Sequence, residues 1–156
     1  RNGRVFATSG YGKGAVSLKL SADGESVELD WSEPRMDTYH GGVVLLDGYV
    51  YGSTHKSGSW ICLDWRAGSV AYEAKGVGKG SVTAAEGMLY CYGDSGVVAL
   101  VPADPKGYEI VSSFRITRGK GKHWAHPVVC GGRLYIRHGD ALMAFDIRDP
   151  QAAAAD

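Results

Sequence analysis

Residues 42–53, GVVLLDGYVYGS, place two short runs of β-prone residues on either side of an Asp-Gly pair. An Asp-Gly pair between two such runs is the strongest short-range signal for a β-hairpin with a tight turn. The second half of this hairpin, GYVY at 48–51, returns as GRVF at 3–6, GMLY at 87–90 and GRLY at 132–135. The chain is therefore predicted to be an array of one small unit.

The period of the array predicts the kind of unit. The aromatic residues of the repeated signature, Phe6, Tyr51, Tyr90 and Tyr135, are separated by 45, 39 and 45 residues. This spacing is typical of four-stranded propeller blades and is too long for a leucine-rich solenoid. A third β-prone run follows the hairpin in every unit, and a fourth run with a single aromatic closes three of the units. The third runs are 15–20, 60–64, 97–101 and 141–146, and the fourth are 28–31, 70–73 and 111–114.

These runs predict an all-β chain, a β-propeller segment of four-stranded antiparallel blades that covers residues 1–150. The blade units are 1–33, 38–74, 79–116 and 123–148. The first unit lacks its innermost strand and the last lacks its outermost strand, which leaves about three and a half blades of a seven- or eight-bladed ring. No segment has a helical period of normal helix length. Residues 151–156 are rich in alanine and follow a proline, so a disordered tail is expected there.

The composition is that of a soluble protein. Seventeen basic residues balance 17 acidic residues, and no apolar stretch is long enough to span a membrane, so neither nucleic acid nor membrane insertion is expected. The three cysteines, Cys62, Cys91 and Cys130, lie in apolar runs without metal-ligand spacing, which predicts buried free thiols. The chain starts at Arg1 without a methionine or signal peptide, as a processed product or a piece of a longer protein would.

An incomplete ring leaves each of its two end blades without a neighbour on one side. Open sheet edges offer unpaired backbone groups, and the outer faces of the end blades expose apolar surface. Propellers close with four to eight blades. We therefore expect the remaining blades of a parent protein, or a second copy of this chain, to cover the two ends.

The repeat resembles a known family. Residues 62–72, CLDWRAGSVAY, look like the Ala-Leu-Asp-x-x-Thr-Gly-x-x-x-Trp docking motif of the pyrroloquinoline-quinone-like (PQQ-like, quinoprotein alcohol dehydrogenase-like) β-propeller repeat family. Cysteine stands for the first alanine, alanine for threonine and tyrosine for tryptophan. The resemblance covers residues 3–148. It implies that Trp31, Tyr72 and Phe114 are structural residues that dock neighbouring blades.

The resemblance also indicates which kinds of function to expect. The family includes quinoprotein alcohol dehydrogenases, the lipoprotein scaffold of outer-membrane β-barrel assembly, and many secreted or periplasmic bacterial proteins that bind no quinone. It therefore implies a periplasmic or secreted protein, and membership alone does not choose an activity. Its quinone enzymes carry adjacent cysteines, a set of calcium-binding carboxylates and a catalytic aspartate. This sequence has no Cys-Cys pair, and a lone carboxylate such as Asp94 is a poor calcium site.

Two main functional hypotheses follow. The first is a non-catalytic binding or scaffolding propeller without a cofactor, whose ligand is a protein, a small molecule or a carbohydrate. The alternative is a fragment of a quinone-dependent dehydrogenase, in which PQQ and calcium would be held largely by residues outside this piece. A sensor domain fused to a membrane or kinase module is a third possibility.

The candidate binding residues share one face of the predicted propeller. Some precede an innermost strand and the others lie in turns between the second and third strands, and both kinds of loop meet at the upper face. Equivalent positions in the repeats carry different side chains, which suggests specialised positions around a central opening. Ordinary solvated loop residues are the competing interpretation. The candidates are Tyr39, His40, His55, Lys79, Asp94, Trp124, His126 and His138.

Other motifs carry less weight. His123 and His126, with His40 or His55 as a third ligand, would suit zinc, but Trp124 interrupts the pair and the segment is extended. Residues 76–81, GVGKGS, lack the spacing and the following helix of a phosphate loop. The basic stretch 115–123 is short, and no serine lies in a nucleophile-elbow motif. No catalytic or metal-binding residue is assigned.

Overall fold

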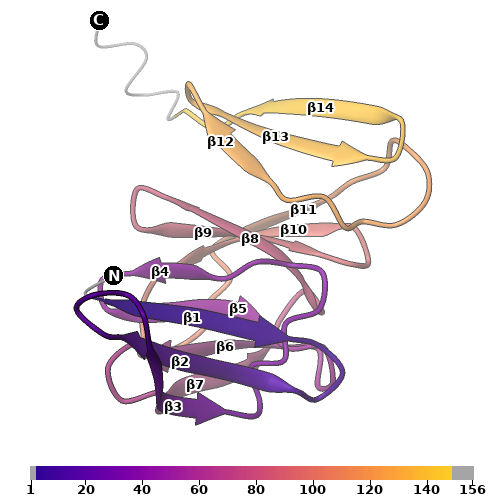
Figure 1. Cartoon of the computed structure of the whole chain (residues 1–156). Helices are drawn as coiled ribbons and strands as arrows, with labels where there is room; N and C mark the ends of the chain where they lie inside the picture. The colour runs from indigo at the N-terminus through magenta and orange to yellow at the C-terminus, as the bar shows by residue number, and fades with distance from the viewer. Residues whose placement is uncertain (1–2, 149–156) are drawn as a thin grey trace, which may run out of the picture.

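The computed structural model describes residues 3–148, which form four antiparallel sheets and contain no helix. The two middle sheets have four strands each and the two end sheets have three (Figure 1). The all-β segment of about three and a half four-stranded blades that the sequence predicts is thus confirmed. The tail expected at residues 151–156 lies outside the described residues. No helix capable of spanning a membrane occurs within residues 3–148.

Each sheet follows the order of the chain. The first blade is β1 (Arg4–Ser9), β2 (Gly14–Leu20) and β3 (Val27–Glu33), and the second is β4 (Val44–Leu46), β5 (Tyr49–Ser53), β6 (Ser59–Asp64) and β7 (Val70–Lys75). The third blade is β8 (Gly80–Ala85), β9 (Met88–Gly93), β10 (Val97–Pro102) and β11 (Ser112–Arg115). The fourth is β12 (Val128–Cys130), β13 (Arg133–His138) and β14 (Ala141–Asp146). The innermost strands β4, β8 and β12 contact one another in turn, so the second, third and fourth blades share a hub.

The hairpins that open the middle blades form as their turn residues require. Asp47 and Gly48 have φ angles of 48° and 84°, and Glu86 and Gly87 have φ angles of 52° and 74°. Two consecutive positive φ values define the turn whose twist matches that of the flanking strands. The Asp-Gly signal in the sequence therefore located the second blade's first hairpin correctly.

The core consists of three layers, each between two neighbouring blades. Ile61 and Leu63 of β6 pack toward the first blade with Ala15, whereas Trp60 and Cys62 of the same strand pack toward the third blade with Cys91. A third layer joins the third and fourth blades through Tyr92, Val98, Ile116, Leu134 and Ile136. Central strands are thus buried on both faces, which explains their continuous apolar runs.

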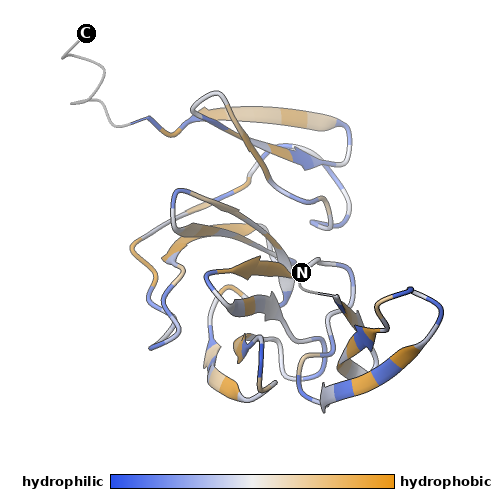
Figure 2. Ribbon diagram, turned by 60° about the vertical axis from the view of Figure 1, so that its left-hand side comes forward, coloured by the Kyte–Doolittle hydropathy of each residue, from blue (hydrophilic) through white to orange (hydrophobic). Residues whose placement is uncertain are grey.

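The two end blades have one bare face each. On the first blade, Val5, Leu20, Val27 and Leu29 are exposed, and on the fourth blade Val128 and Leu142 are exposed. Figure 2 shows hydrophobic and hydrophilic residues alternating along a strand of the first blade, the pattern of a sheet packed on one side only. We call these two surfaces the first-blade flank and the fourth-blade flank.

One expectation about the cysteines is wrong. Cys62 and Cys91 are buried as predicted, but Cys130 is exposed. Cys130 lies opposite Arg133 in the register of β12 and β13, and Arg133 lies opposite Asp146 of β14. All three side chains therefore lie on the fourth-blade flank, where no neighbouring blade within residues 3–148 covers them.

Candidate functional site

A continuous series of aromatic and imidazole rings lies where the upper-face loops converge. Its members are Tyr11, Tyr39, His40, His55 and Trp124, which we call the upper mouth. Tyr11 comes from the β1–β2 turn, Tyr39 and His40 from the β3–β4 connection, His55 from the β5–β6 turn, and Trp124 from the β11–β12 connection. Loops of three blades thus contribute to one surface.

Each ring of the upper mouth packs against at least one other ring. Tyr11 and Tyr39 meet edge to face at 5.0 Å, and Tyr39 lies 4.7 Å from His55. His40 stacks on Trp124 with a centroid distance of 5.2 Å and an interplanar angle of 24°. The hydroxyl of Tyr11 donates a hydrogen bond of 2.9 Å to the hydroxyl of Tyr39, and this bond raises the pKa of Tyr11. Aromatic pairs in these geometries add to the packing energy and order the loops that carry them.

The outer members of the series remain accessible. Tyr11, Tyr39 and Trp124 are 71%, 39% and 44% exposed. Tyrosine and tryptophan combine a large apolar face with a polar group and lose little conformational entropy when they bind, so they are enriched at recognition surfaces. The upper mouth is therefore an exposed apolar surface whose rings are already held in place.

The charged groups around the rings are mostly cationic. The Lys79 ammonium lies 3.3 Å from Nδ1 of His55, and the Lys122 ammonium lies 5.9 Å from the centre of a Trp124 ring. Asp94 is the acidic side chain close enough to influence the pKa of His40 and His123. A ligand at the upper mouth would thus meet aromatic faces with lysines beside them.

His40 occupies the most confined position in the series. Neither of its ring nitrogens has a hydrogen-bond partner, and both are shielded from solvent. Burial lowers the pKa of His40, because the charged imidazolium loses hydration that nothing replaces. The neutral ring offers one donor and one acceptor, which a ligand can satisfy.

A buried carboxylate holds the loops of the upper mouth together, and the sequence analysis missed it. Asp37 is 1% exposed and accepts hydrogen bonds from the backbone N–H groups of Gly12, His55 and Lys56, at 2.9, 2.8 and 3.2 Å. These bonds connect the turn that carries Tyr11 to the turn that carries His55. No sequence signal distinguishes Asp37 from an ordinary loop aspartate. Tyr11 was also missed, although it lies in the β1–β2 turn, which corresponds to the turns between second and third strands that the sequence analysis places on the upper face.

The structure brings together most, but not all, of the residues proposed for the site. His126 lies beside the upper mouth, where a Cβ on Gly42 would be 3.1 Å from its Cε1. His138 instead is buried, with its ring nitrogens 2.8 Å from the Arg118 carbonyl and 3.0 Å from the Gly121 carbonyl. It stacks on His123 at 3.7 Å, and Nδ1 of His123 is hydrogen-bonded to the Tyr92 hydroxyl. The buried His138 ring therefore holds the loop before β12 in place through its hydrogen bonds to these two carbonyl groups.

The three aromatics expected to dock blades all lie at blade boundaries. Trp31 donates a hydrogen bond of 3.2 Å from its indole nitrogen to the Trp65 carbonyl, and its ring lies against Gly68. Tyr72 packs into the layer between the second and third blades, 6.5 Å from the Tyr108 ring. Phe114 meets Phe145 of the fourth blade at 4.7 Å. Each side chain thus contacts the blade that follows its own.

Metal coordination finds no support in these residues. Among residues 3–148, no three histidine, cysteine, aspartate or glutamate side chains lie close enough together to hold a metal ion. His123, one of the ligands considered for zinc, is already engaged by Tyr92 and His138. Within residues 3–148 the histidines considered as zinc ligands are therefore not gathered into one group.

Comparison with known proteins shows the fold. No known protein family and no curated protein matches the sequence. Among solved structures, BamB from Moraxella catarrhalis is similar, with a TM-score of 0.68 and 18% sequence identity over 92% of this chain and 40% of that chain. The chain thus spans about two fifths of the length of BamB. This likeness, together with the four sheets, shows that the chain is a β-propeller segment.

Proposed function

We propose that this chain belongs to a non-catalytic binding or scaffolding propeller of a bacterial secreted or periplasmic protein, and that it holds a ligand or partner at the upper mouth. The observation that carries the proposal is the series of rings from Tyr11 to Trp124, built from loops of three blades. The resemblance to the PQQ-like repeat and the fold shared with BamB are compatible with a binding propeller.

Several features favour binding over catalysis. The exposed rings supply contact area, and Lys79 and Lys122 supply cationic donors for orientation. The carboxylate of Asp37 is not free to act as a base, because backbone N–H groups of three residues donate hydrogen bonds to it. A binding surface needs ordered loops more than it needs a shifted pKa, and the Asp37 hydrogen bonds provide that order.

Tryptophan fluorescence provides the test. Trp60 and Trp65 are buried, and the half-buried Trp31 lies against Gly68 at the boundary of the first two blades. A probe that binds at the upper mouth should therefore change mainly the emission of the exposed Trp124. We would titrate the chain with a defined panel of neutral and acidic oligosaccharides and of acidic peptides. A saturable change is expected for at least one class, and Tyr39→Ala should weaken binding by about tenfold, equivalent to about 1.4 kcal/mol.

Ile110→Ala is the matched control. Ile110 is 44% exposed, as Trp124 is, but lies in the β10–β11 connection on the opposite face. This variant should bind like the wild type. A probe whose affinity is the same for wild type, Tyr39→Ala and Trp124→Ala, measured by calorimetry, would place the binding site elsewhere.

A further inference from the structure

The charged loop residues of this chain are divided between its two faces. Neighbouring strands in each blade are antiparallel, so the loops after odd-numbered strands lie on the upper face and those after even-numbered strands on the lower face. The basic side chains of the upper loops that form no ion pair within residues 3–148 are Lys13, Lys56, Lys79, Arg118, Lys120 and Lys122. The acidic side chains of the lower loops are Asp23, Glu25, Asp47, Glu86, Asp104 and Glu109.

Few opposite charges offset this division. Asp94 and Asp140 lie in upper loops, and the buried carboxylate of Asp37 already accepts backbone N–H groups. The lower loops carry Arg66 and Lys106 as their basic residues. The balanced total charge therefore conceals a cationic upper face, whose field attracts anions.

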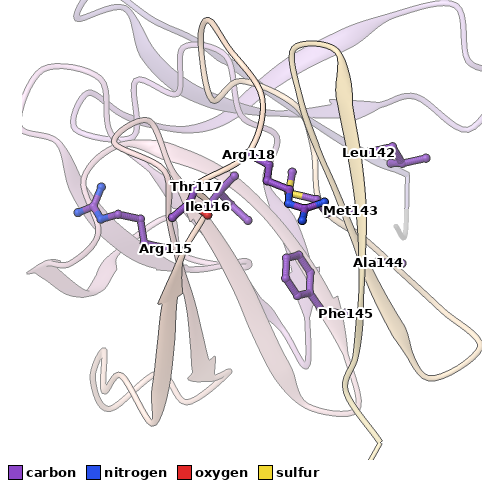
Figure 3. Close-up of a pocket in the computed structure, with 8 residues that line it drawn as sticks. All are labelled: Arg115, Ile116, Thr117, Arg118, Leu142, Met143, Ala144 and Phe145. Carbon is purple, nitrogen blue, oxygen red and sulfur yellow. The ribbon is translucent and has the colours of Figure 1, made fainter.

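Two of the upper lysines adjoin rings of the upper mouth. A lysine ammonium can only donate, so Nδ1 of His55 accepts the 3.3 Å hydrogen bond from Lys79, and within residues 3–148 no carboxylate forms an ion pair with this ammonium. The Lys122 ammonium lies 5.9 Å from the centre of a Trp124 ring. Arg118, by contrast, lines a separate pocket beside β14 (Figure 3). Lys79 and Lys122 are thus the cations that an anion on the rings would meet.

The two combinations of ring and ammonium lie next to each other. The Tyr39 ring is 4.7 Å from that of His55, beside Lys79, and 6.0 Å from that of Trp124, beside Lys122. Each combination offers an apolar face and a positive charge. A polymer whose units each carry an apolar face and a carboxylate can therefore place neighbouring units on the two combinations.

The hydroxyl groups of the upper mouth favour a saccharide over a peptide. Because Tyr11 donates to Tyr39, the Tyr39 hydroxyl still has a proton to donate and the Tyr11 oxygen still has lone pairs that can accept. Sugar hydroxyls both donate and accept, and the C–H face of a sugar ring is apolar. A peptide main chain would find no strand edge here, because the upper mouth is built from loops.

On the basis of the binding role proposed above, we propose that the upper mouth binds an acidic saccharide made of uronic-acid units. Its sugar faces stack on Tyr39 and Trp124, its carboxylates pair with Lys79 and Lys122, and its hydroxyls bond to the tyrosine hydroxyls. The rings supply contact area and the lysines select the anionic form. None of these residues belongs to the first-blade flank or the fourth-blade flank.

Trigalacturonic acid and its methyl ester are matched probes, because esterification removes the charges and keeps the sugar rings. Calorimetry on the full chain should show that the acid binds about tenfold more tightly than the ester. Raising the salt concentration from about 0.01 M to about 0.1 M shortens the Debye length from about 30 Å to about 10 Å, so it should weaken binding of the acid and leave the ester unchanged. Trimers of glucuronic acid and their esters repeat the comparison with a second sugar.

Variants separate the charge from the stacking surface. Lys79→Gln should lower the affinity for the acid by about fivefold and leave that for the ester unchanged, whereas Lys79→Arg should keep the preference for the acid. Trp124→Ala should weaken binding of acid and ester alike. Lys106→Gln, in a lower loop, is the matched control and should bind both probes as the wild type does. Circular dichroism checks that each variant is folded.

Three results would overturn the assignment of an acidic saccharide. The first is equal affinity for acid and ester with both weakened by Tyr39→Ala, which would leave the binding role standing without selection by charge. The second is triglutamate or a single-stranded oligonucleotide that binds at least as tightly and depends on Tyr39 in the same way, which would make the ligand a peptide or a nucleic acid. The third is the absence of binding by both uronic-acid trimers. If no other probe binds at the upper mouth either, the proposed binding role is wrong as well.

Discussion

At the scale of single residues, Gly68 shows how one blade is locked to the next. It adopts a φ of +70°, and a Cβ added there would overlap the indole of Trp31 from the preceding blade. Position 68 therefore needs glycine for two reasons. Its backbone is left-handed, and the indole of Trp31 leaves no room for a side chain. The docking motif identified the glycine, and the structure identifies the ring that needs its space.

The comparison of Gly68→Ala with Gly48→Ala separates the two requirements. Gly48 has a φ of +84°, but a Cβ there would meet nothing within 4 Å. Gly48→Ala should therefore cost only the backbone term, roughly 1 kcal/mol. Gly68→Ala should cost a further ~1–3 kcal/mol, because Trp31 must move. Urea unfolding of both variants measures the difference, and equal losses would show that Trp31 does not dock on Gly68.

His40 makes stability depend on pH. Burial lowers its pKa in the folded chain below the ordinary value of 6.5, and burial lowers that of His123 as well. The unfolded chain therefore binds protons more strongly, so stability is greatest above about pH 6.5 and falls as the pH drops toward the folded-state pKa. His40→Gln, which cannot titrate, should reduce this loss in urea unfolding between pH 7 and pH 5. An unchanged pH profile in His40→Gln would contradict the buried neutral state.

At the scale of strands and turns, the sequence predicts the features that depend only on residues close together in the chain. The hairpin at Asp47 and Gly48 was found because positive φ values favour glycine and aspartate whatever surrounds them. Several residues of the upper mouth were expected on one face because the repeat places equivalent loops there. What the sequence could not predict depends on contacts between distant segments. His138 turns inward to two carbonyls twenty and seventeen residues earlier, and Asp37 binds turns of two blades.

Strand β12 gives a testable prediction at this scale. Cys130 lies on the fourth-blade flank and is exposed, whereas burial raises the pKa of both Cys62 and Cys91 to about 12. A thiolate is the reactive form, so buried thiols of raised pKa react slowly. A disulfide-exchange reagent at pH 8 should modify one cysteine in the folded chain and three in urea, and Cys130→Ser should remove the fast reaction. Slow modification of Cys130 would show that the flank is covered in solution.

At the scale of the whole molecule, the two flanks differ from every internal blade boundary. Every internal blade boundary is filled by a packed apolar layer, while the first-blade and fourth-blade flanks present exposed leucine and valine. Exposed apolar patches of this kind mark interaction surfaces or cause aggregation. We propose that further blades of a longer ring, or a second copy of the chain, cover them.

The isolated chain should therefore associate as its concentration rises. Leu29 is 64% exposed on the first-blade flank, so Leu29→Lys should change the free energy of unfolding by no more than about 0.5 kcal/mol. It should nevertheless reduce both the association seen by sedimentation and the binding of a hydrophobic dye. The control is Leu63→Ala, a change inside a packed layer, which should cost roughly 2–5 kcal/mol. A wild-type chain that stays monomeric and binds no dye at every concentration would show that the bare flanks need no cover, and would exclude a ring of two copies.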